Sequence, residues 1–444
     1  MNEDRYVAAI EISSSKIMTV VGKMHADGQL DIIATEQEKG LESVRYGVIQ
    51  NLVETSSRID RIIGKLERKP AVAPRHITGL FVGLSGQSVR SIPTKVSLSL
   101  PDDTEITDDI LNRLRDQAFN TAIDNSLEVV DAVPRSYTVG RIETSTPKGN
   151  VGNSISAEFD LVVCRPVIKR NLQSTIEEKL GIRIDGIVVS ALATGRYILS
   201  AEQKRLGCML VDMGAETTTV TIYKNGHLVY FATLPLGGRN ITRDITTLNI
   251  LEERAEELKI TSGNAIPRET VSTINYNGVS DADVSNLIVA RAEEIAVNIL
   301  KQVQYAGLKD SDIPGGIILI GGGAKLSGMI DLLVDKSGLR VSRGQLPPFI
   351  HVEDVKNGSG DIIEVAAVLY AGATGEPDAI CLELPEKGED LPVTGTAPEK
   401  GAERTAEETH EEEQKPSGIS RLVGKIRNGI TQIFSGTEDD SDLI

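Results

Sequence analysis

One order of elements occurs twice in this chain: strand, acidic residue, small-residue turn, strand, hairpin and strand. In the first copy, the strand 6–11 ends in Glu11, the turn is Ile12-Ser13-Ser14-Ser15-Lys16, and strands 17–21 and 30–35 flank Asp27-Gly28. In the second copy, the strand 208–211 leads to Asp212, the turn is Met213-Gly214-Ala215-Glu216-Thr217, and strands 218–223 and 227–233 flank Asn225-Gly226. Apolar residues at helical spacing follow each copy, at Ile59, Ile62, Ile63 and Leu66 and at Ile288, Ala292, Ile295, Ile299 and Val303. The repeat therefore predicts two similar α/β domains.

A third small-residue turn, Gly321-Gly322-Gly323-Ala324, follows a predicted strand over 316–320 and precedes a predicted helix over 325–334. Small residues let a backbone approach a ligand closely, and a helix N-terminus attracts anions. Any one of these turns has a simpler explanation, because a turn that needs a positive φ also selects glycine. Together, the three turns predict a nucleotide in a cleft, with turn amides donating to phosphates and the carboxylates of Glu11 and Asp212 holding Mg²⁺ through water.

The composition argues against several classes of protein. A chain of 444 residues has room for roughly three domains or a few linked subdomains. Aromatic residues make up only 3% and Trp is absent, which argues against a protein that reads carbohydrate or single-stranded nucleic acid by stacking. The formal net charge is -17, so we expect no nucleic acid partner.

Cysteine, histidine and apolar runs narrow the expectation further. Cys164, Cys208 and Cys381 form no CxxC pair and the five histidines are scattered, so a zinc site, a disulfide framework and a cysteine nucleophile lack support. No run approaches the roughly 18 consecutive apolar residues of a spanning helix. Because the first residues also lack a basic signal-peptide region, we expect a cytoplasmic protein.

The composition changes after Leu382, where we expect the folded part to end. The segment 383–416 holds eleven acidic and four basic residues and very few large apolar ones, which predicts a disordered, extended acidic linker. A loop packed on the folded part is the alternative. Beyond the linker we expect an amphipathic helix over 417–435 and then an acidic tail over 436–444.

The predicted helix 417–435 has one apolar face. Seven residues fall within about 120° of arc at helical spacing, and these are Ile419, Leu422, Val423, Ile426, Ile430, Ile433 and Phe434. The segment also carries three positive charges, Arg421, Lys425 and Arg427. At about 24 Å it is too short to cross a bilayer, so we expect it to lie on an anionic membrane surface with its apolar face down. Docking onto the folded part or onto a partner groove is the alternative.

These turns resemble those of the actin superfamily, which also includes sugar kinases and DnaK-type chaperones, and within it the FtsA family of bacterial cell-division proteins. Glu11 to Lys16 is similar to the first phosphate loop of the superfamily, usually Asp-Ile-Gly-Thr-Ser-Lys, and Asp212 to Thr218 is similar to the second. The stretch 235–244 resembles the entry to the second domain, and 255–259 resembles the motif Ala-Glu-x-Leu-Lys. The resemblance covers about 6–373 and resumes at the terminal helix, and it implies an actin-like fold of two ribonuclease-H-like domains.

The resemblance implies ATP or ADP with Mg²⁺ as cofactors. The implied nucleotide-binding residues are Ser13, Ser14, Ser15, Lys16, Gly214, Ala215, Thr217, Thr218, Gly238, Glu256, Lys259, Gly321, Gly322 and Gly323. Glu256 and Lys259 share a helix face and would flank the adenosine, or alternatively form an ordinary surface ion pair.

An inserted α+β subdomain carries the resemblance to FtsA itself. Its sequence signals are the stretches 82–86, 131–139 and 147–152. The implied division is subdomain 1A over 1–84 and 165–200, inserted subdomain 1C over 85–164, subdomain 2A over 201–239 and 315–382, and subdomain 2B over 240–314. In the family, subdomain 1C serves self-assembly into filaments and contacts with later division proteins. Pilus-assembly proteins related to FtsA share this insertion.

Three residues depart from the family's phosphate loops. Glu11 replaces Asp, Ser13 stands where glycine is usual and would be costly if that position needs a positive φ, and Glu216 replaces a glycine near the phosphates. We expect ATP to bind nevertheless, with the hydroxyls of Ser13, Ser14 and Thr217 as added donors and Glu216 turned outward. No water-positioning residue is evident, so we expect slow or no hydrolysis.

The resemblance implies a scaffold that self-polymerises and tethers FtsZ filaments to the cytoplasmic face of the inner membrane at the division septum. The FtsZ C-terminal tail would dock on subdomain 2B, where Arg291 matches a family arginine and is the candidate partner of an acidic tail. Alternatively, Arg291 is a solvated helix charge. Two other functions stay open: a pilus-assembly-type adaptor, and a small-molecule kinase of the same superfamily.

Overall fold

The computed structural model describes residues 4–40, 42–267, 275–276, 279–353 and 362–385. The predicted helix 417–435 and the acidic tail 436–444 lie outside the described residues, and so does the predicted linker beyond residue 385. In the part of the chain that is described, no helix combines the length and the apolar character needed to cross a membrane.

The first large sheet has the strand order β12-β7-β1-β2-β3-β20. Its strands are β1 (Arg5–Ile12), β2 (Lys16–Met24), β3 (Leu30–Lys39), β7 (Gly79–Leu84), β12 (Arg183–Val189) and β20 (Ile350–Val352). Strands β1, β2 and β3 pair antiparallel, whereas β7 joins β1 and β12 joins β7 in parallel. Nearly every residue of β1 and β7 is buried, as expected for central strands that helices cover on both faces. The helices packed here are α1 (Leu52–Glu67), α3 (Pro166–Gln173), α4 (Ser190–Ile198) and α10 (Ile363–Gly375).

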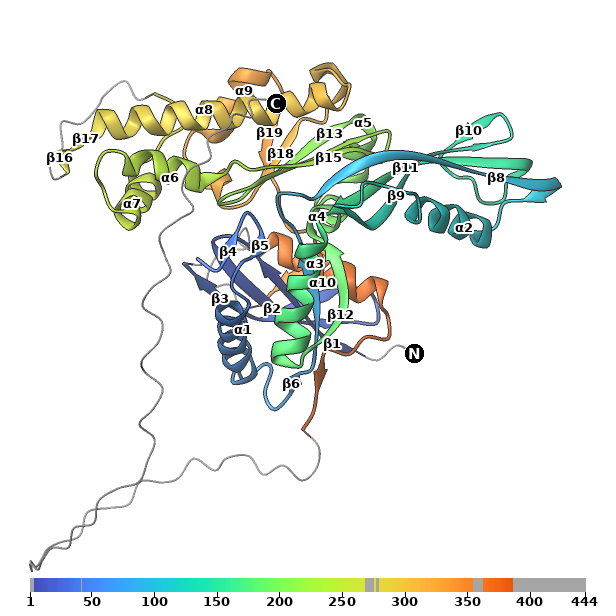
Figure 1. The fold of residues 1–444 in the computed structure, drawn as a ribbon, viewed down its shortest axis with the longest axis horizontal. Coiled ribbons are helices and arrows are strands. Elements are labelled where there is room, and N and C mark those ends of the chain that lie inside the picture. Colours follow the sequence, from blue (N-terminus) through green and yellow to red (C-terminus); the bar gives the residue numbers. More distant parts are fainter. Residues whose placement is uncertain (1–3, 41, 268–274, 277–278, 354–361, 386–444) are drawn as a thin grey trace, which may run out of the picture. The chain divides into compact units, whose positions relative to one another are not determined.

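The second large sheet repeats this topology in the order β15-β14-β13-β18-β19. Its strands are β13 (Cys208–Met213), β14 (Thr218–Lys224), β15 (His227–Leu234), β18 (Ile317–Ile320) and β19 (Val341–Arg343). Again three antiparallel strands are followed by two parallel ones, so the predicted duplication is confirmed (Figure 1). The accompanying helices are α5 (Ala201–Leu206), α6 (Gly238–Thr246), α7 (Glu252–Ser262), α8 (Asp281–Tyr305) and α9 (Met329–Ser337).

The helix predicted over 325–334 was placed too early, because α9 begins at Met329. Gly328 precedes it with φ +75°, a left-handed conformation that a continuous helix does not allow. The neighbourhood also demands glycine, since a Cβ there would lie 2.3 Å from Asn264 Oδ1. A short 3-10 turn, Gly323–Lys325, ends at the residue where the helix was predicted to begin.

A third sheet, in the order β10-β9-β11-β8, forms the insertion between β7 and α3. Its elements are β8 (Arg90–Glu105), α2 (Asp108–Phe119), β9 (Glu128–Val139), β10 (Ile142–Thr144) and β11 (Val151–Cys164). It has its own core, with Phe159 and Leu114 among the buried residues, and it lies beside β15 (Figure 1). Arg135 donates to the carbonyl of Val229 on β15, so the insertion is bonded directly to the second large sheet.

Short elements complete the described fold. They are β4 (Val44–Arg45), β5 (Val48–Ile49), β6 (His76–Ile77), a π-helical turn (Ser174–Glu178), β16 (Asn275–Tyr276), β17 (Val279–Ser280), a 3-10 turn (Asp310–Asp312) and β21 (Leu382–Glu383).

Candidate nucleotide cleft

The first small-residue turn connects β1 to β2 and is closed on itself. The amide and the hydroxyl of Ser13 both donate to the carbonyl of Lys16, at 3.0 and 2.9 Å. Among the described non-glycine residues, positive φ occurs at Tyr46, Asp103, Asn225 and Asn249. Ser13 is not one of them, so its Cβ brings no left-handed backbone strain.

The second small-residue turn connects β13 to β14 and holds the start of α6. The amide of Gly214 donates to Thr217 O at 2.9 Å. The first amides of α6 point back at the turn, with Gly238 N donating to Gly214 O at 2.9 Å and Arg239 N to Ala215 O at 2.7 Å. Backbone hydrogen bonds therefore fix the start of helix α6 against the turn.

The third turn packs directly on the second. Gly321 has φ +88°, and a Cβ on it would lie 2.3 Å from Asp212 Oδ1. A Cβ on Gly323 would lie 2.6 Å from the side chain of Met213. Gly322, in contrast, faces open space, with nothing within 4 Å of its would-be Cβ. The glycines at 321 and 323 are thus required for close packing, and Gly322 leaves room beside them.

Helix α7 brings Lys259 to the same place. Its ammonium group donates to Gly238 O at 3.0 Å, to Thr242 Oγ1 at 2.9 Å and to Glu256 Oε2 at 2.6 Å. The side chain of Lys259 is only 13% exposed, whereas that of Glu256 is 44% exposed. Burial lowers the pKa of Lys259, and the carboxylate of Glu256 opposes that change. A Cβ on Gly238 would lie 3.7 Å from Gly323 Cα, so the third turn, α6 and α7 converge.

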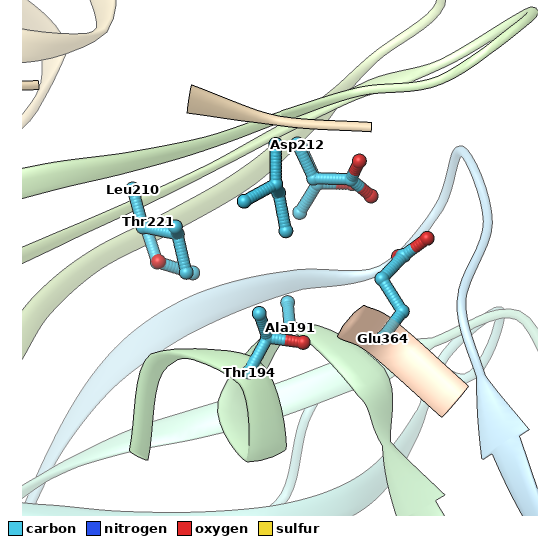
Figure 2. A pocket seen from close by; sticks show the side chains of 8 residues that line it. Ala191, Thr194, Leu210, Asp212, Thr221 and Glu364 are labelled. Carbon is cyan, nitrogen blue, oxygen red and sulfur yellow. The ribbon is translucent and has the colours of Figure 1, made fainter. Parts of the chain in front are cut away.

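Three carboxylates from different elements gather behind the turns. Glu11 lies on β1, Asp212 on β13 and Glu364 in the first turn of α10. Figure 2 shows Asp212 and Glu364 lining one small pocket together with residues of α4, β14 and β18. Burial raises the pKa of Glu11 to about 8, and the nearby Glu364 adds to this shift. Burial and the same Glu364 raise the pKa of Asp212 well above its ordinary value.

The two carboxylates predicted to hold the metal, Glu11 and Asp212, differ in their hydrogen bonds. Both oxygens of Glu11 accept hydrogen bonds, from Ser85 Oγ at 3.0 Å and from Ser190 Oγ at 2.8 Å. Asp212 Oδ1 is buried without a hydrogen-bond partner in the described part of the chain. An orphaned buried carboxylate oxygen fits the role of acceptor toward a hydrated cation. Among the described residues, no group of three His, Cys, Asp or Glu side chains is placed to hold a metal ion directly.

Glu364 was missed by the sequence analysis. It is the one charged residue in the apolar run 362–373, and a lone charge in an apolar helix was the signal that could have revealed it. Its partners are far away in the sequence, so no local motif contains it.

Glu216 is not turned outward, as we had expected, but is buried. Its side chain is 0% exposed. One oxygen accepts from Arg45, Arg239 and Arg243 at 3.1, 3.2 and 2.7 Å, and the other accepts from the amide of Tyr46 at 2.8 Å. Burial alone would raise the pKa of Glu216, but the amide of Tyr46 and the guanidinium groups outweigh it, so the pKa is lowered. Four donors compensate the carboxylate, which is why a charge is tolerated inside.

Arg291, the predicted partner of an acidic tail, lies on α8. It is bound to Asp244 of α6 by two hydrogen bonds of 2.5 and 2.9 Å, and it also contacts Glu294. The side chain is 26% exposed. Arg291 is therefore neither a cleft residue nor a freely solvated charge.

Comparison with family models gives two matches. Residues 209–360 match the model "Cell division protein FtsA", and residues 86–163 match the model "SHS2 domain inserted in FTSA". The second match falls on the inserted third sheet.

Individual proteins agree with the models. The chain is 32% identical to a cell division protein FtsA of Porphyromonas gingivalis over 334 residues, which cover 72% of this chain and 68% of that protein. It is 28% identical to a cell division protein FtsA of Streptococcus pneumoniae, with 85% of each covered. Among solved structures, a chain of a PilM-PilN type IV pilus biogenesis complex superposes with a TM-score of 0.60 at 15% identity, covering 83% of this chain and 98% of that one. The repeated sheets, the inserted domain and this level of identity establish that the chain belongs to the FtsA family of actin-like cell-division proteins.

Proposed function

We propose that the cleft binds ATP or ADP together with Mg²⁺. The observation that carries this proposal is the convergence of the second and third small-residue turns with Lys259 around Gly238. Phosphates would contact the turns at 13–16 and 214–218, and adenosine would lie between Lys259, Glu256 and the turn 321–323. Asp212 would hold the cation through water, with Glu11 beside it. Mg²⁺ would supply positive charge that neutralises the phosphates.

We treat the nucleotide as a conformational ligand that is hydrolysed slowly or not at all. A hydrolytic site needs a group that positions water near the terminal phosphate. Both oxygens of Glu11 are already engaged with serine hydroxyls, which makes it a poor base in this arrangement. A phosphate-release rate of about 1–100 s⁻¹, as in ordinary kinases, would contradict this view.

The wider function we propose is a cell-division scaffold that self-polymerises and tethers FtsZ to the inner membrane. Membership of the FtsA family supports it, and so does the amphipathic pattern over 417–435. A single short helix with seven apolar residues gives weak, reversible binding, so a filament of many copies would bind far more firmly than one copy. Subdomain 1C, over 85–164, would take part in self-assembly and in contacts with later division proteins.

Sedimentation with vesicles tests the tether. Anionic liposomes are mixed with FtsZ and either the full chain or a version ending at Pro416, and the FtsZ that sediments with lipid is measured. The proposal expects FtsZ in the pellet only with the full chain. If both versions bring down equal amounts of FtsZ, the terminal helix is not the anchor.

A pilus-assembly-type adaptor is the second candidate, because the superposition covers 98% of the chain from the PilM-PilN complex. It shares the fold but not the partner. Binding of the full chain to lipid while FtsZ stays in solution would favour this reading.

A further inference from the structure

The turn between β4 and β5 bonds to both predicted phosphate loops at once. Gly47 N donates to Ser14 Oγ in the first loop at 2.9 Å. Tyr46 N donates to Glu216 Oε2 in the second loop at 2.8 Å. Tyr46 and Gly47 both adopt positive φ, at 50° and 75°, which turns their consecutive amides toward the two loops. One tight turn therefore lies between loops that belong to the two repeated domains.

The carboxylate of Glu216 completes this connection. Arg45 reaches it from the first domain, while Arg239 and Arg243 reach it from α6 of the second. If the domains moved apart, Arg45 and the amide of Tyr46 would leave, and a buried carboxylate would lose two of its four donors. Incomplete compensation of a buried charge is costly, so the carboxylate resists this separation.

We propose that Glu216 is a carboxylate latch that holds the two phosphate loops together when no nucleotide is bound. Its negative charge attracts groups of both domains, as phosphates of a bound nucleotide would. Glu216 is thus a positioning residue for the cleft, and closure of this chain depends less on nucleotide than it would with glycine at this position. The reference to phosphates rests on the proposed nucleotide site, whereas the latch itself does not.

The turn between β4 and β5, which we call the latch turn, also contacts the start of the inserted subdomain. The amide of Gln87 donates to Tyr46 O at 3.0 Å, and a Cβ on Gly47 would lie 2.6 Å from Gly86 Cα. Because these contacts are backbone to backbone, a shift of the latch turn is transmitted to the strand that opens the insertion. Release of Glu216 should therefore increase amide hydrogen exchange at 86–92.

Pulsed electron-spin distance measurements on the full chain test the latch. Nitroxide labels are placed at Val53→Cys on α1 and Tyr305→Cys on α8, which are 64% and 69% exposed. The three native cysteines are buried, so labelling is directed to the introduced sites. Without nucleotide, we expect one narrow distance in the otherwise unchanged chain. Glu216→Gly and Arg45→Gln should each add a second population at a different distance.

Matched variants separate the latch from general damage. Glu38→Gln is the control, because Glu38 also binds arginines, Arg58 and Arg61, but only within the first domain. It should keep the single narrow distance. If circular dichroism shows that Glu216→Gly folds poorly, the result with Arg45→Gln tests the proposal, since that variant leaves Glu216 bound to Arg239 and Arg243. A narrow, unchanged distance in Arg45→Gln without nucleotide would overturn the proposal.

The nucleotide arm distinguishes this inference from the proposed function. Adding Mg²⁺ and ATP should return both variants to the narrow distance if the cleft binds nucleotide. If ATP fails to bind by calorimetry, the nucleotide proposal is lost, and the nucleotide-free distances still decide the latch.

Discussion

The carboxyl groups of Asp212, on β13, and Glu364, on α10, line the same small pocket between elements of the two repeated domains (Figure 2). Burial raises the pKa of Asp212 and of Glu11 on β1, and Glu364 adds to both shifts. Gathering buried carboxylates is unfavourable, and the charge of Lys16 opposes these shifts. A cation bound nearby would relieve this cost to the stability of the ligand-free protein.

Replacing Glu364 should stabilise the ligand-free protein. Glu364→Gln removes one of the facing carboxylates, so the free energy of unfolding at pH 7.5 should rise by about 1–2 kcal/mol. Chemical denaturation measures the change. Glu376→Gln, at the exposed end of the same helix, is the matched control and should change stability little. A loss of stability in Glu364→Gln would show that favourable partners hold its carboxylate.

A methyl group at Gly321 should weaken nucleotide binding. Gly321→Ala places a Cβ against Asp212 Oδ1 in a backbone conformation with φ +88°, so it displaces the carboxylate that would hold the cation. Calorimetric titration with Mg²⁺ and ATP should show at least a roughly tenfold weaker affinity, or about 1.4 kcal/mol. Gly338→Ala is the control, because Gly338 also has a positive φ, at 66°, and has open space around it.

The two variants separate the effect of backbone strain from the effect of contact with Asp212. Both should lose about 1 kcal/mol of stability from the left-handed backbone. Only Gly321→Ala should lose affinity for nucleotide. Equal affinities in the two variants would argue against a nucleotide at the third turn.

The elements that neighbouring residues encode could be predicted from the sequence. Strands, hairpins and the three turns could be predicted because each is encoded within some ten neighbouring residues. Glu216 was placed wrongly because two of its four donors, Arg45 and the amide of Tyr46, are distant in the sequence and lie in the other domain. Glu364 escaped notice for the same reason, since its role comes from facing Asp212. The late start of α9 depends on the contact between Gly328 and Asn264, which is also non-local.

Stability should depend on pH through His25. The hydrogen bond that the His25 ring donates to the carboxylate of Asp31 raises the pKa of His25, outweighing partial burial, and Asp4 adds to the shift. A histidine whose pKa is raised by folding contributes stability below its unfolded pKa near 6.5, and this contribution is lost as the pH rises through the folded pKa. The loss should be about 0.5 kcal/mol or less because the pair is partly exposed.

An NMR titration of the histidine resonances measures this directly. Asp31→Asn should move the pKa of His25 down toward its ordinary value and flatten the dependence of stability on pH between 6 and 8. Asp27→Asn, in the neighbouring hairpin turn, is the control and should leave the pKa of His25 unchanged. A pKa of His25 that stays raised in Asp31→Asn would assign the shift to Asp4 instead.

Asp244 should compete with any acidic peptide that binds Arg291. Because Asp244 holds the guanidinium by two hydrogen bonds, Asp244→Asn leaves it held mainly by Glu294 and should strengthen binding of the FtsZ C-terminal tail by roughly twofold to tenfold. Arg291→Gln should weaken the same binding. Fluorescence anisotropy with a labelled tail peptide measures both. Unchanged binding in both variants would exclude Arg291 from the tail site.

The apolar face of the segment 417–435 should decide membrane binding. Ile426→Glu puts a charge in the middle of that face and removes a large apolar side chain, which is worth about 1.5–3 kcal/mol on full burial. Binding of the full chain to anionic liposomes should therefore fall tenfold or more. Gln432→Glu, which introduces the same charge on the opposite face, is the control. It should lose less binding to liposomes, and added salt should weaken the binding of the unchanged chain to a similar degree by screening charge. Equal losses in the two variants would mean that charge alone, and not an inserted apolar face, attaches this segment to lipid.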